Sequence, residues 1–288
     1  ASTLAAVGGT LGPVIPPSIC FIMYGVVAGV SITDLFIAGI IPGILIMTSL
    51  MVCTYFVSKV KRYGTKNNNK FTIKGFISGL NEAKWALIMP IIILGGIYAG
   101  WFTPTEAACI SCIYGFIIAI FVYKELKWKD IPALFAKTGL TIGTAVVMVG
   151  CAMAFGQVLT FMKVPGTVAT LITSLTDNVI VVLLLINLLL FIVGMFMETL
   201  SAILILAPLL LTIVAPYNID PIQFGIIMTV NLVIGQVTPP VGVNLFIASQ
   251  IDNVKIDKMF KWLPLLVGVM LIDLMIVTYV PALSTFLV

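Results

Sequence analysis

The chain is built from long apolar runs separated by short polar stretches. Apolar runs of about 20 residues recur along it, which is the length of an α-helix that crosses the hydrocarbon core of a bilayer. Runs such as "VIVVLLLINLLLFIVGMF" lack the apolar–polar alternation of a transmembrane β-strand. The pattern predicts an all-α polytopic membrane protein, with candidate spans at about 13–30, 33–58, 85–101, 103–123, 139–161, 179–196, 199–216, 224–250 and 262–287. A further apolar segment, 164–176, is too short to cross.

Three polar loops carry most of the lysines and therefore predict the orientation of the chain. They lie at 59–74, 124–137 and 255–261. Lysine and arginine concentrate on the cytoplasmic side of membrane proteins, so all three loops are expected in the cytoplasm. An even number of crossings must then separate each loop from the next.

The segment "GMFMETLSA" between the runs 179–196 and 199–216 admits two topologies. Both runs cross the bilayer, with their turn at a membrane face, or they form a re-entrant hairpin that dips in from outside and returns. We favour the hairpin, because a polar, acid-bearing turn within apolar sequence suits a tip that is buried in protein and binds something. Its candidate binding residues are Gly194, Met197, Glu198, Thr199 and Ser201. For Glu198, a cap on the second leg is the structural alternative.

A helix-breaking phrase occurs twice, as "GPVIPP" at 12–17 and "GQVTPP" at 235–240. Proline lacks a backbone N–H and clashes with the preceding turn, so each Pro–Pro pair leaves carbonyl groups without helical partners. Such groups are expensive in hydrocarbon and persist where they face a cavity or a cation. We therefore predict Na⁺ sites at the two breaks, formed from Gly12, Ile15, Pro16, Ser18, Gly235, Thr238, Pro239, Gly242 and Asn244. The alternative is that each Pro pair only kinks a helix.

The charge pattern also orients the two breaks. The helix after the first break is expected to run from inside to outside, and the helix that carries the second break from outside to inside. Inverted repeats with broken helices near the bilayer midplane are typical of secondary transporters.

Composition narrows the function classes. The chain is 61% hydrophobic and 9% charged, whereas soluble domains carry about 25% charged residues. Its formal charge of +4 comes from short loops and does not indicate a nucleic-acid partner. The absence of histidine excludes His-based proton relays and zinc–His sites, and the five cysteines are expected to pack in apolar spans.

Several segments, in order along the whole chain, resemble the large membrane subunit of tripartite ATP-independent periplasmic (TRAP) transporters. They are "GTLGPVIPPSI", "YGVVAGVSITDLFIAGIIPG", "GWFTPTEAA", "GMFMETLSAILILAPLL" and "FGIIMTVNLVIGQVTPPVGVNLF". The resemblance implies a sodium-coupled, inverted-repeat elevator transporter in the bacterial inner membrane that imports an organic acid of the sialic acid or C4-dicarboxylate type. It also implies two partners, a periplasmic substrate-binding protein and a small four-helix membrane subunit. The chain is expected to be a fragment, since the family's first hairpin tip would lie upstream.

The resemblance also implies a division of the chain. Residues 1–30 would end the transport element of the first repeat, and 31–137 would hold scaffold helices and basic loops. Residues 138–178 would connect to the second repeat, 179–250 would hold the hairpin and the second broken helix, and 251–288 the final scaffold helix.

Two acidic residues within or beside spans call for separate interpretation. Glu106 stands three residues after Thr103, the spacing of a capping box. Asp273 lies in mid-span, where an acid by default indicates a functional role. The resemblance places it on a scaffold helix, so a buried partner or a contact surface for the small subunit is an equal alternative. A second aspartate in mid-span, which an intramembrane aspartyl protease would need, is absent; an intramembrane enzyme and a passive channel or scaffold subunit remain the alternatives to a transporter.

Overall fold

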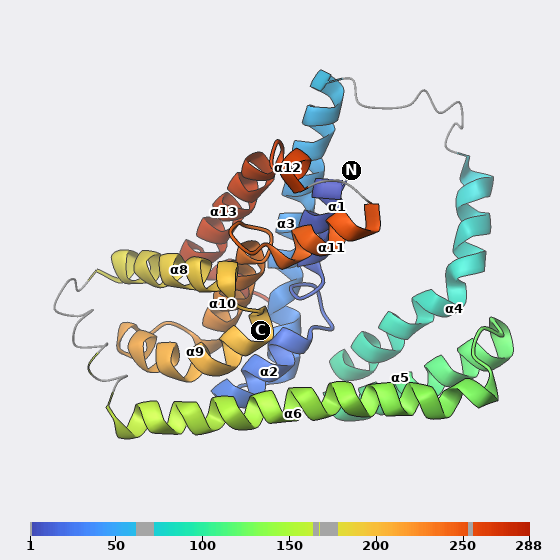
Figure 1. The fold of residues 1–288 in the computed structure, drawn as a ribbon, viewed down its shortest axis with the longest axis horizontal. Coiled ribbons are helices and arrows are strands. Elements are labelled where there is room, and N and C mark those ends of the chain that lie inside the picture. Colours follow the sequence, from blue (N-terminus) through green and yellow to red (C-terminus); the bar gives the residue numbers. More distant parts are fainter. Residues whose placement is uncertain (1, 62–71, 164–166, 168–177, 253–255) are drawn as a thin grey trace. The chain divides into compact units, whose positions relative to one another are not determined.

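The computed structural model describes residues 2–61, 72–163, 167, 178–252 and 256–288, and these form helices and connecting turns without a strand among them (Figure 1). The chain is an all-α polytopic membrane protein, as the hydrophobic pattern predicts. It divides into two compact units, residues 57–147 and residues 1–56 with 148–288. The short segment 164–176 and parts of the first and third basic loops fall outside the described residues.

The larger unit contains most of the helices. These are α1 (Ser2–Gly8), η1 (Gly9–Leu11), α2 (Ile19–Ala28), most of α3 (Ile32–Lys61), the end of α6 (Ile131–Phe161), α8 (Val179–Phe196), α9 (Thr199–Val214), η4 (Ala215–Tyr217), α10 (Pro221–Gly235), α11 (Val243–Asp252), α12 (Ile256–Met259), α13 (Leu263–Tyr279) and α14 (Ala282–Thr285).

Helix α10 forms the centre of this unit. Asp220 caps its N-terminus by accepting hydrogen bonds from the backbone N–H groups of Ile222 and Gln223, and Pro221 occupies its first turn. Every residue from Gln223 to Gly235 is buried, and α8, α9, α13 and α2 pack against the helix. Because α10 is buried on all sides, apolar residues occupy every face of the helix, and its sequence lacks an amphipathic stripe.

Both Pro–Pro phrases interrupt helices. Residues 12–18 are non-helical between η1 and α2, and residues 236–242 are non-helical between α10 and α11. The predicted spans 13–30 and 224–250 are therefore not continuous helices: the first contains only α2, and the second contains two helices. The missing proline N–H groups account for both interruptions.

The smaller unit is an antiparallel pair of helices followed by the start of α6. It contains α4 (Ile73–Tyr98), α5 (Pro104–Ile117), the π-helix η2 (Ile118–Val122) and η3 (Trp128–Asp130). Helix α4 begins at Ile73, ahead of the apolar span predicted at 85–101, and its first part carries Lys74, Glu82 and Lys84. The capping box is confirmed: Glu106 Oε2 accepts from the Thr103 N–H at 2.8 Å, and Thr103 Oγ1 accepts from the Glu106 N–H at 3.3 Å.

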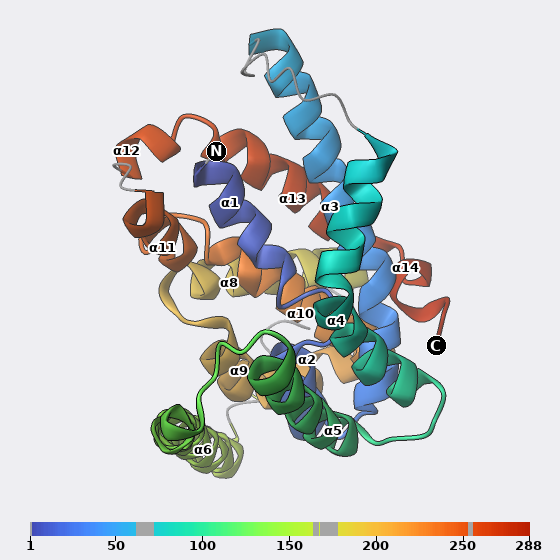
Figure 2. The same cartoon turned by 90° about the vertical axis from the view of Figure 1, so that its right-hand side faces the viewer.

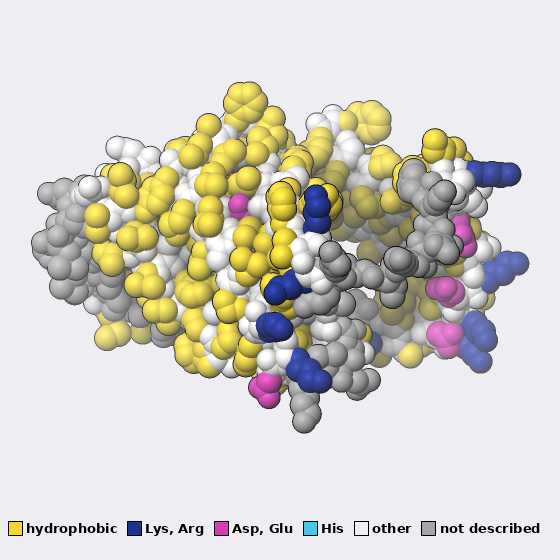
Figure 3. Space-filling view, turned by 90° about the horizontal axis from the view of Figure 1, so that it is seen from above, with side chains coloured by type: hydrophobic (Ala, Val, Ile, Leu, Met, Phe, Trp, Pro, Cys, Tyr) yellow, Lys and Arg dark blue, Asp and Glu magenta, His cyan; other side chains and the backbone are white. Residues whose placement is uncertain are grey.

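The surface fits a bilayer. Five helical stretches within the described residues are long and apolar enough to cross a membrane: Ile32–Lys61, Ile73–Tyr98, Pro104–Val122, Val179–Phe196 and Thr199–Tyr217. Figure 3 shows a face covered largely by hydrophobic side chains with few charged ones. Since water-facing surfaces do not normally expose apolar patches of this extent, these side chains are suited to lipid or to apolar partner helices.

Candidate functional site

The first break is held in shape by Ser18. This buried residue caps α2: its hydroxyl accepts from the Phe21 N–H at 3.3 Å and donates to the carbonyl of Pro13. The carbonyl oxygens of Gly12, Ile15 and Pro16 receive no hydrogen bond from any residue that the structure describes. The break therefore presents several free carbonyl oxygens beside the N-terminus of α2.

The second break has a comparable arrangement. Thr238 Oγ1 donates to the carbonyl of Ile234 at 2.9 Å, and the Asn244 N–H donates to the carbonyl of Gln236 at 3.2 Å, which closes the loop. Gly242 adopts a φ of 58°, a left-handed conformation that glycine adopts without strain. Within the described part of the chain, no donor reaches the carbonyl oxygens of Thr238 and Pro239.

The chemistry of both breaks suits a hard cation. Their candidate ligands are carbonyl and hydroxyl oxygens, the atoms that such ions prefer. The Thr238 hydroxyl donates its hydrogen and keeps both lone pairs, whereas the Ser18 hydroxyl keeps one. The predicted residues thus offer the oxygen types that a hard cation prefers, and the Thr238 hydroxyl has more free lone pairs than that of Ser18.

The predicted hairpin tip touches the second break directly. A Cβ added to Gly235 would lie 2.4 Å from the carbonyl carbon of Gly194, and one added to Gly194 would lie 2.7 Å from the carbonyl oxygen of Leu232. Neither position has room for a side chain. Two glycines thus bring the end of α8 into backbone contact with the end of α10, a packing mode common between membrane helices.

The tip also approaches the first break. Glu198 is the N-cap of α9, accepting from the Ser201 N–H at 3.1 Å, and it lies near Cys20 in the first turn of α2, along which α9 packs. The structure thus gives Glu198 the capping role. Next to it, Thr199 is 1% exposed, and its hydroxyl has no hydrogen-bond partner among the described residues.

The two legs of the tip pack mainly against different elements. Helix α8 lies along α10, which leads into the second break, and α9 lies along α2, which follows the first. Contacts between α8 and α9 themselves are few. The tip Gly194–Ser201 is consequently wedged between the two broken elements.

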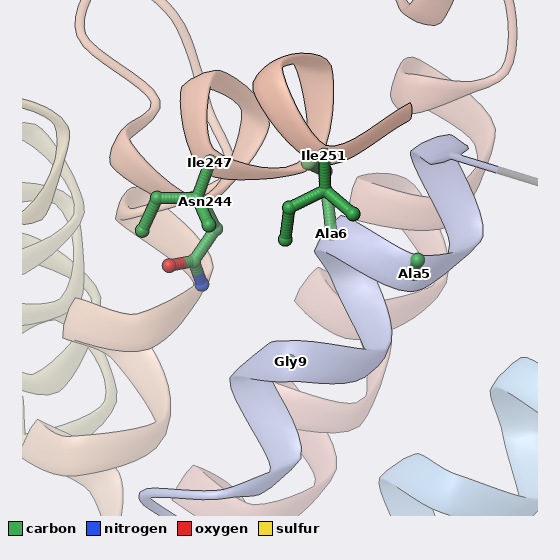
Figure 4. A pocket seen from close by; sticks show the side chains of 7 residues that line it. Ala5, Ala6, Gly9, Asn244, Ile247 and Ile251 are labelled. Atoms are coloured by element: carbon green, nitrogen blue, oxygen red, sulfur yellow. The ribbon is translucent and has the colours of Figure 1, made fainter. Parts of the chain in front are cut away.

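A cavity of about 180 Å³ lies where α1 meets α11. Figures 1 and 2 both draw these helices side by side. Figure 4 shows the Asn244 side chain on α11 directed toward the space beside Gly9 of α1, and Ala6 and Ile251 also line it. Asn244, predicted from the second phrase, therefore lies beside the helix that leads into the first.

Sequence reasoning missed a buried polar cluster. Asn231 of α10 donates to the carbonyl oxygen and side-chain oxygen of Asn187 on α8, at 2.9 and 2.8 Å, and Asn187 donates to Thr278 of α13 at 3.0 Å. Gln223 also donates to the Thr278 carbonyl. The signal was present as single amides inside apolar runs, but their pairing depends on the fold.

Asp273 has a buried partner. It is 3% exposed on α13 and accepts a hydrogen bond from the Ser49 hydroxyl on α3. This contact supports the interpretation in which the mid-span acid joins two helices.

The predicted site residues thus gather in one unit but not at one point. Gly194 meets Gly235, Glu198 lies near the start of α2, and Asn244 lies beside Gly9. Among the residues with described positions, no hydrogen bond joins the two breaks to each other.

Comparison with known proteins gives consistent results. A family model described as "Tripartite ATP-independent periplasmic transporter, DctM component" matches residues 1–283. The chain is 45% identical, over 99% of its length and 45% of the relative's, to the isethionate TRAP transporter permease protein DctMQ of Oleidesulfovibrio alaskensis. It is 40% identical, over 96% of its length and 64% of the relative's, to the C4-dicarboxylate TRAP transporter large permease protein DctM of Pseudomonas aeruginosa.

A third relative is the sialic acid TRAP transporter permease protein SiaT of Haemophilus influenzae, 36% identical over 98% of this chain and 46% of the relative. The chain spans between about half and two thirds of the length of these relatives. All three are named as transporter permeases and not as enzymes.

Proposed function

Because the chain belongs to the family of the DctM component of tripartite ATP-independent periplasmic transporters, we propose that it forms the membrane path of a sodium-coupled importer of an organic acid. The observation that carries the proposal is the position of the tip Gly194–Ser201, in contact with one helix break and close to the other. Because of this position, an ion bound at either break would alter the packing of the tip.

Sodium would bind at the breaks. Free carbonyl oxygens of Gly12, Ile15 and Pro16 at the first, and of Thr238 and Pro239 at the second, supply ligands that require no proton exchange. Bound Na⁺ supplies positive charge in a site that is otherwise poor in it. The residues of the chain hold the loop shape: Ser18 and Thr238 by side-chain hydrogen bonds, Gly242 by its left-handed backbone.

The substrate would bind at the tip. The relatives' names give isethionate, C4-dicarboxylates and sialic acid, all organic acids. The N-terminus of α2 at Ser18 carries a positive dipole end that would favour an anionic group, whereas the Glu198 carboxylate already caps the N-terminus of α9. The buried, unpartnered Thr199 hydroxyl offers a hydrogen-bonding group at the same place.

Movement would follow an elevator scheme. Segments 1–30 and 179–250 would move together as the transport unit, against a scaffold that includes 33–58 and 262–287. In support, α1 packs on α11 and α2 packs on both α9 and α10, while the Ser49–Asp273 hydrogen bond joins α3 to α13 within the scaffold group. The movement would have to exchange the contacts that join α10 and α8 to α13, including the hydrogen bonds of Gln223 and Asn187 with Thr278.

The partners follow from the family. In the bacterial inner membrane, a periplasmic binding protein would deliver the organic acid, and a small four-helix membrane subunit would complete the complex. We expect the permease to be inactive as an importer without the binding protein.

Reconstitution in liposomes tests the proposal. The complete permease, with its small subunit and binding protein, should accumulate a labelled organic acid only under an inward sodium gradient. Uptake that persists without sodium or without the binding protein would indicate a passive channel. Chemical conversion of the substrate without accumulation would indicate an enzyme.

A further inference from the structure

A second cavity, larger than the first, lies in the smaller unit, which does not contain the breaks. It is an open cavity of about 450 Å³, lined by the second half of α5, η2, the turn after it and the start of α6. Its lining is almost wholly apolar and includes Cys112, Phe116, Ala119, Leu126, Leu134 and Phe135.

The cavity lies beside a local change in helix geometry. In η2 the Tyr123 N–H donates to the Ile118 carbonyl at 2.9 Å, five residues back, which widens the turn relative to an α-helix. Such π-turns often occur at functional sites. The small Ala119 lies on this turn, and the stacked rings of Phe116 and Phe135, with centroids 5.9 Å apart, form a rigid wall.

The size and lining define the class of ligand. Ligand pockets usually have volumes of about 300–1,000 Å³, so the cavity is large enough for a flexible chain. Its lining offers little hydrogen bonding, so a polar solute would lose its water without compensation. Because α5 and η2 together are long and apolar enough to cross a membrane, hydrocarbon chains are present beside the cavity.

The segment that contributes part of the lining is rich in lysine. Residues 124–137 carry Lys124, Lys127, Lys129 and Lys137 against Glu125 and Asp130, four positive charges against two negative, a balance of +2. Lys127 follows the lining residue Leu126, and Lys137 precedes the lining residue Thr138. Within the described ranges none of the four lysines forms an ion pair, and Trp128 beside them is 70% exposed, as is usual for tryptophan at the membrane interface.

We propose that this cavity binds one acyl chain of an anionic phospholipid whose phosphate group lies among the lysines of residues 124–137. An apolar slot beside a lysine-rich segment matches both ends of such a lipid: the chain avoids water, and the headgroup meets unpaired positive charge. The site is separate from the breaks and does not depend on the substrate or on sodium coupling.

Two native cysteines allow a direct test. Cys112 lines the cavity, whereas Cys109, one turn earlier on α5, is also exposed but does not line it. The complete permease in neutral detergent is treated with N-ethylmaleimide, with dioleoyl-phosphatidylglycerol or dioleoyl-phosphatidylcholine added, and labelling of each cysteine is followed by peptide mass spectrometry. Phosphatidylglycerol should slow labelling of Cys112 several-fold more than phosphatidylcholine and leave Cys109 unchanged.

Variants separate the two parts of the site. Ala119→Phe, which fills the cavity, should abolish the lipid effect, and Lys127→Gln with Lys137→Gln should reduce protection by phosphatidylglycerol to that by phosphatidylcholine. Lys61→Gln with Lys74→Gln removes the same two charges from another lysine-rich segment and should change nothing. Melting temperatures establish that each variant is folded, and Leu126→Trp replaces Ala119→Phe if the latter is not.

Three results would overturn the proposal: equal protection by both lipids, protection that survives both cavity-filling variants, or protection of Cys112 by the small subunit in lipid-free detergent. The last would assign the cavity to an apolar helix of that partner.

Discussion

Thr199 and Thr229 are both buried threonines with hydroxyls unpaired in the described part of the chain, but they lie on different helices. Both are at most 1% exposed, and neither hydroxyl has a hydrogen-bond partner among the described residues. A hydroxyl buried without a partner lowers the free energy of unfolding by about 1–3 kcal/mol. Replacing either threonine with valine, which has nearly the same shape, should therefore not destabilise the fold. Thr199 lies at the tip between the breaks, whereas Thr229 lies within α10, where we assign no role.

Thr199→Val should therefore reduce transport without reducing stability. The melting temperature should stay the same or rise, because the unpaired hydroxyl is removed, while organic-acid uptake falls at least tenfold. Thr229→Val is the matched control and should preserve uptake. Equal uptake by both variants would remove Thr199 from the binding site.

Thr238 provides the most direct test of sodium at the second break. Thr238→Ala should raise the sodium concentration needed for half-maximal uptake, because the ion loses a hydroxyl ligand, and Thr238→Ser should restore it. Ser18→Ala also removes an N-cap, which costs about 1 kcal/mol, so its sodium dependence must be measured per folded molecule. An unchanged sodium dependence in both alanine variants would contradict the assignment.

Gly235→Ala tests the backbone contact at the tip. Its Cβ would lie 2.4 Å from Gly194, so α8 and α10 must separate, and overpacking of this kind costs about 1–3 kcal/mol. We expect a lower melting temperature and loss of uptake. Gly268→Ala on α13, where no atom lies within 4 Å of the added carbon, should be neutral or slightly stabilising.

Among the elements, those set by local chemistry were predictable. Both breaks follow from the missing N–H groups of proline, and the start of α5 follows from the Thr103–Glu106 spacing. The extension of α4 ahead of the predicted span 85–101 does not follow from hydropathy, because residues 73–84 include Lys74, Glu82 and Lys84. The Gly194–Gly235 contact and the Asn187–Asn231 pair were not predictable, since they join distant positions whose meeting depends on the packing of α8 against α10.

The second break can be tested as an element by replacing Pro239 and Pro240 with alanine. Alanine is favoured over proline by about 3 kcal/mol in a helix interior, so helix should extend through the gap and consume the free carbonyls. The fold should survive or gain stability while sodium-driven uptake fails. Lower stability with normal uptake per folded molecule would mean that the break only kinks the helix.

At the scale of the whole molecule, the two topologies of the segment 179–216 place the tip Gly194–Ser201 at different depths in the membrane. Each leg, Val179–Phe196 and Thr199–Tyr217, has the length and apolarity of a full crossing. A re-entrant hairpin places the tip within the protein, whereas two crossings place it at the cytoplasmic face.

Met197→Cys distinguishes these topologies. In a variant without other cysteines, a membrane-impermeant maleimide applied to inside-out vesicles should label residue 197 far more slowly than a cysteine at position 127 in the second basic loop. The reason is that the re-entrant tip is shielded by α2 and α10. Labelling at equal rates would establish two full crossings.

The wedged position of the tip has a thermodynamic consequence. Because Gly194 touches one break and Glu198 lies near the other, an ion at either break that shifts the tip changes the free energy of occupying the other. Linkage makes this effect reciprocal. Sodium ions at the two breaks should thus bind cooperatively, through a tip that belongs to neither site alone.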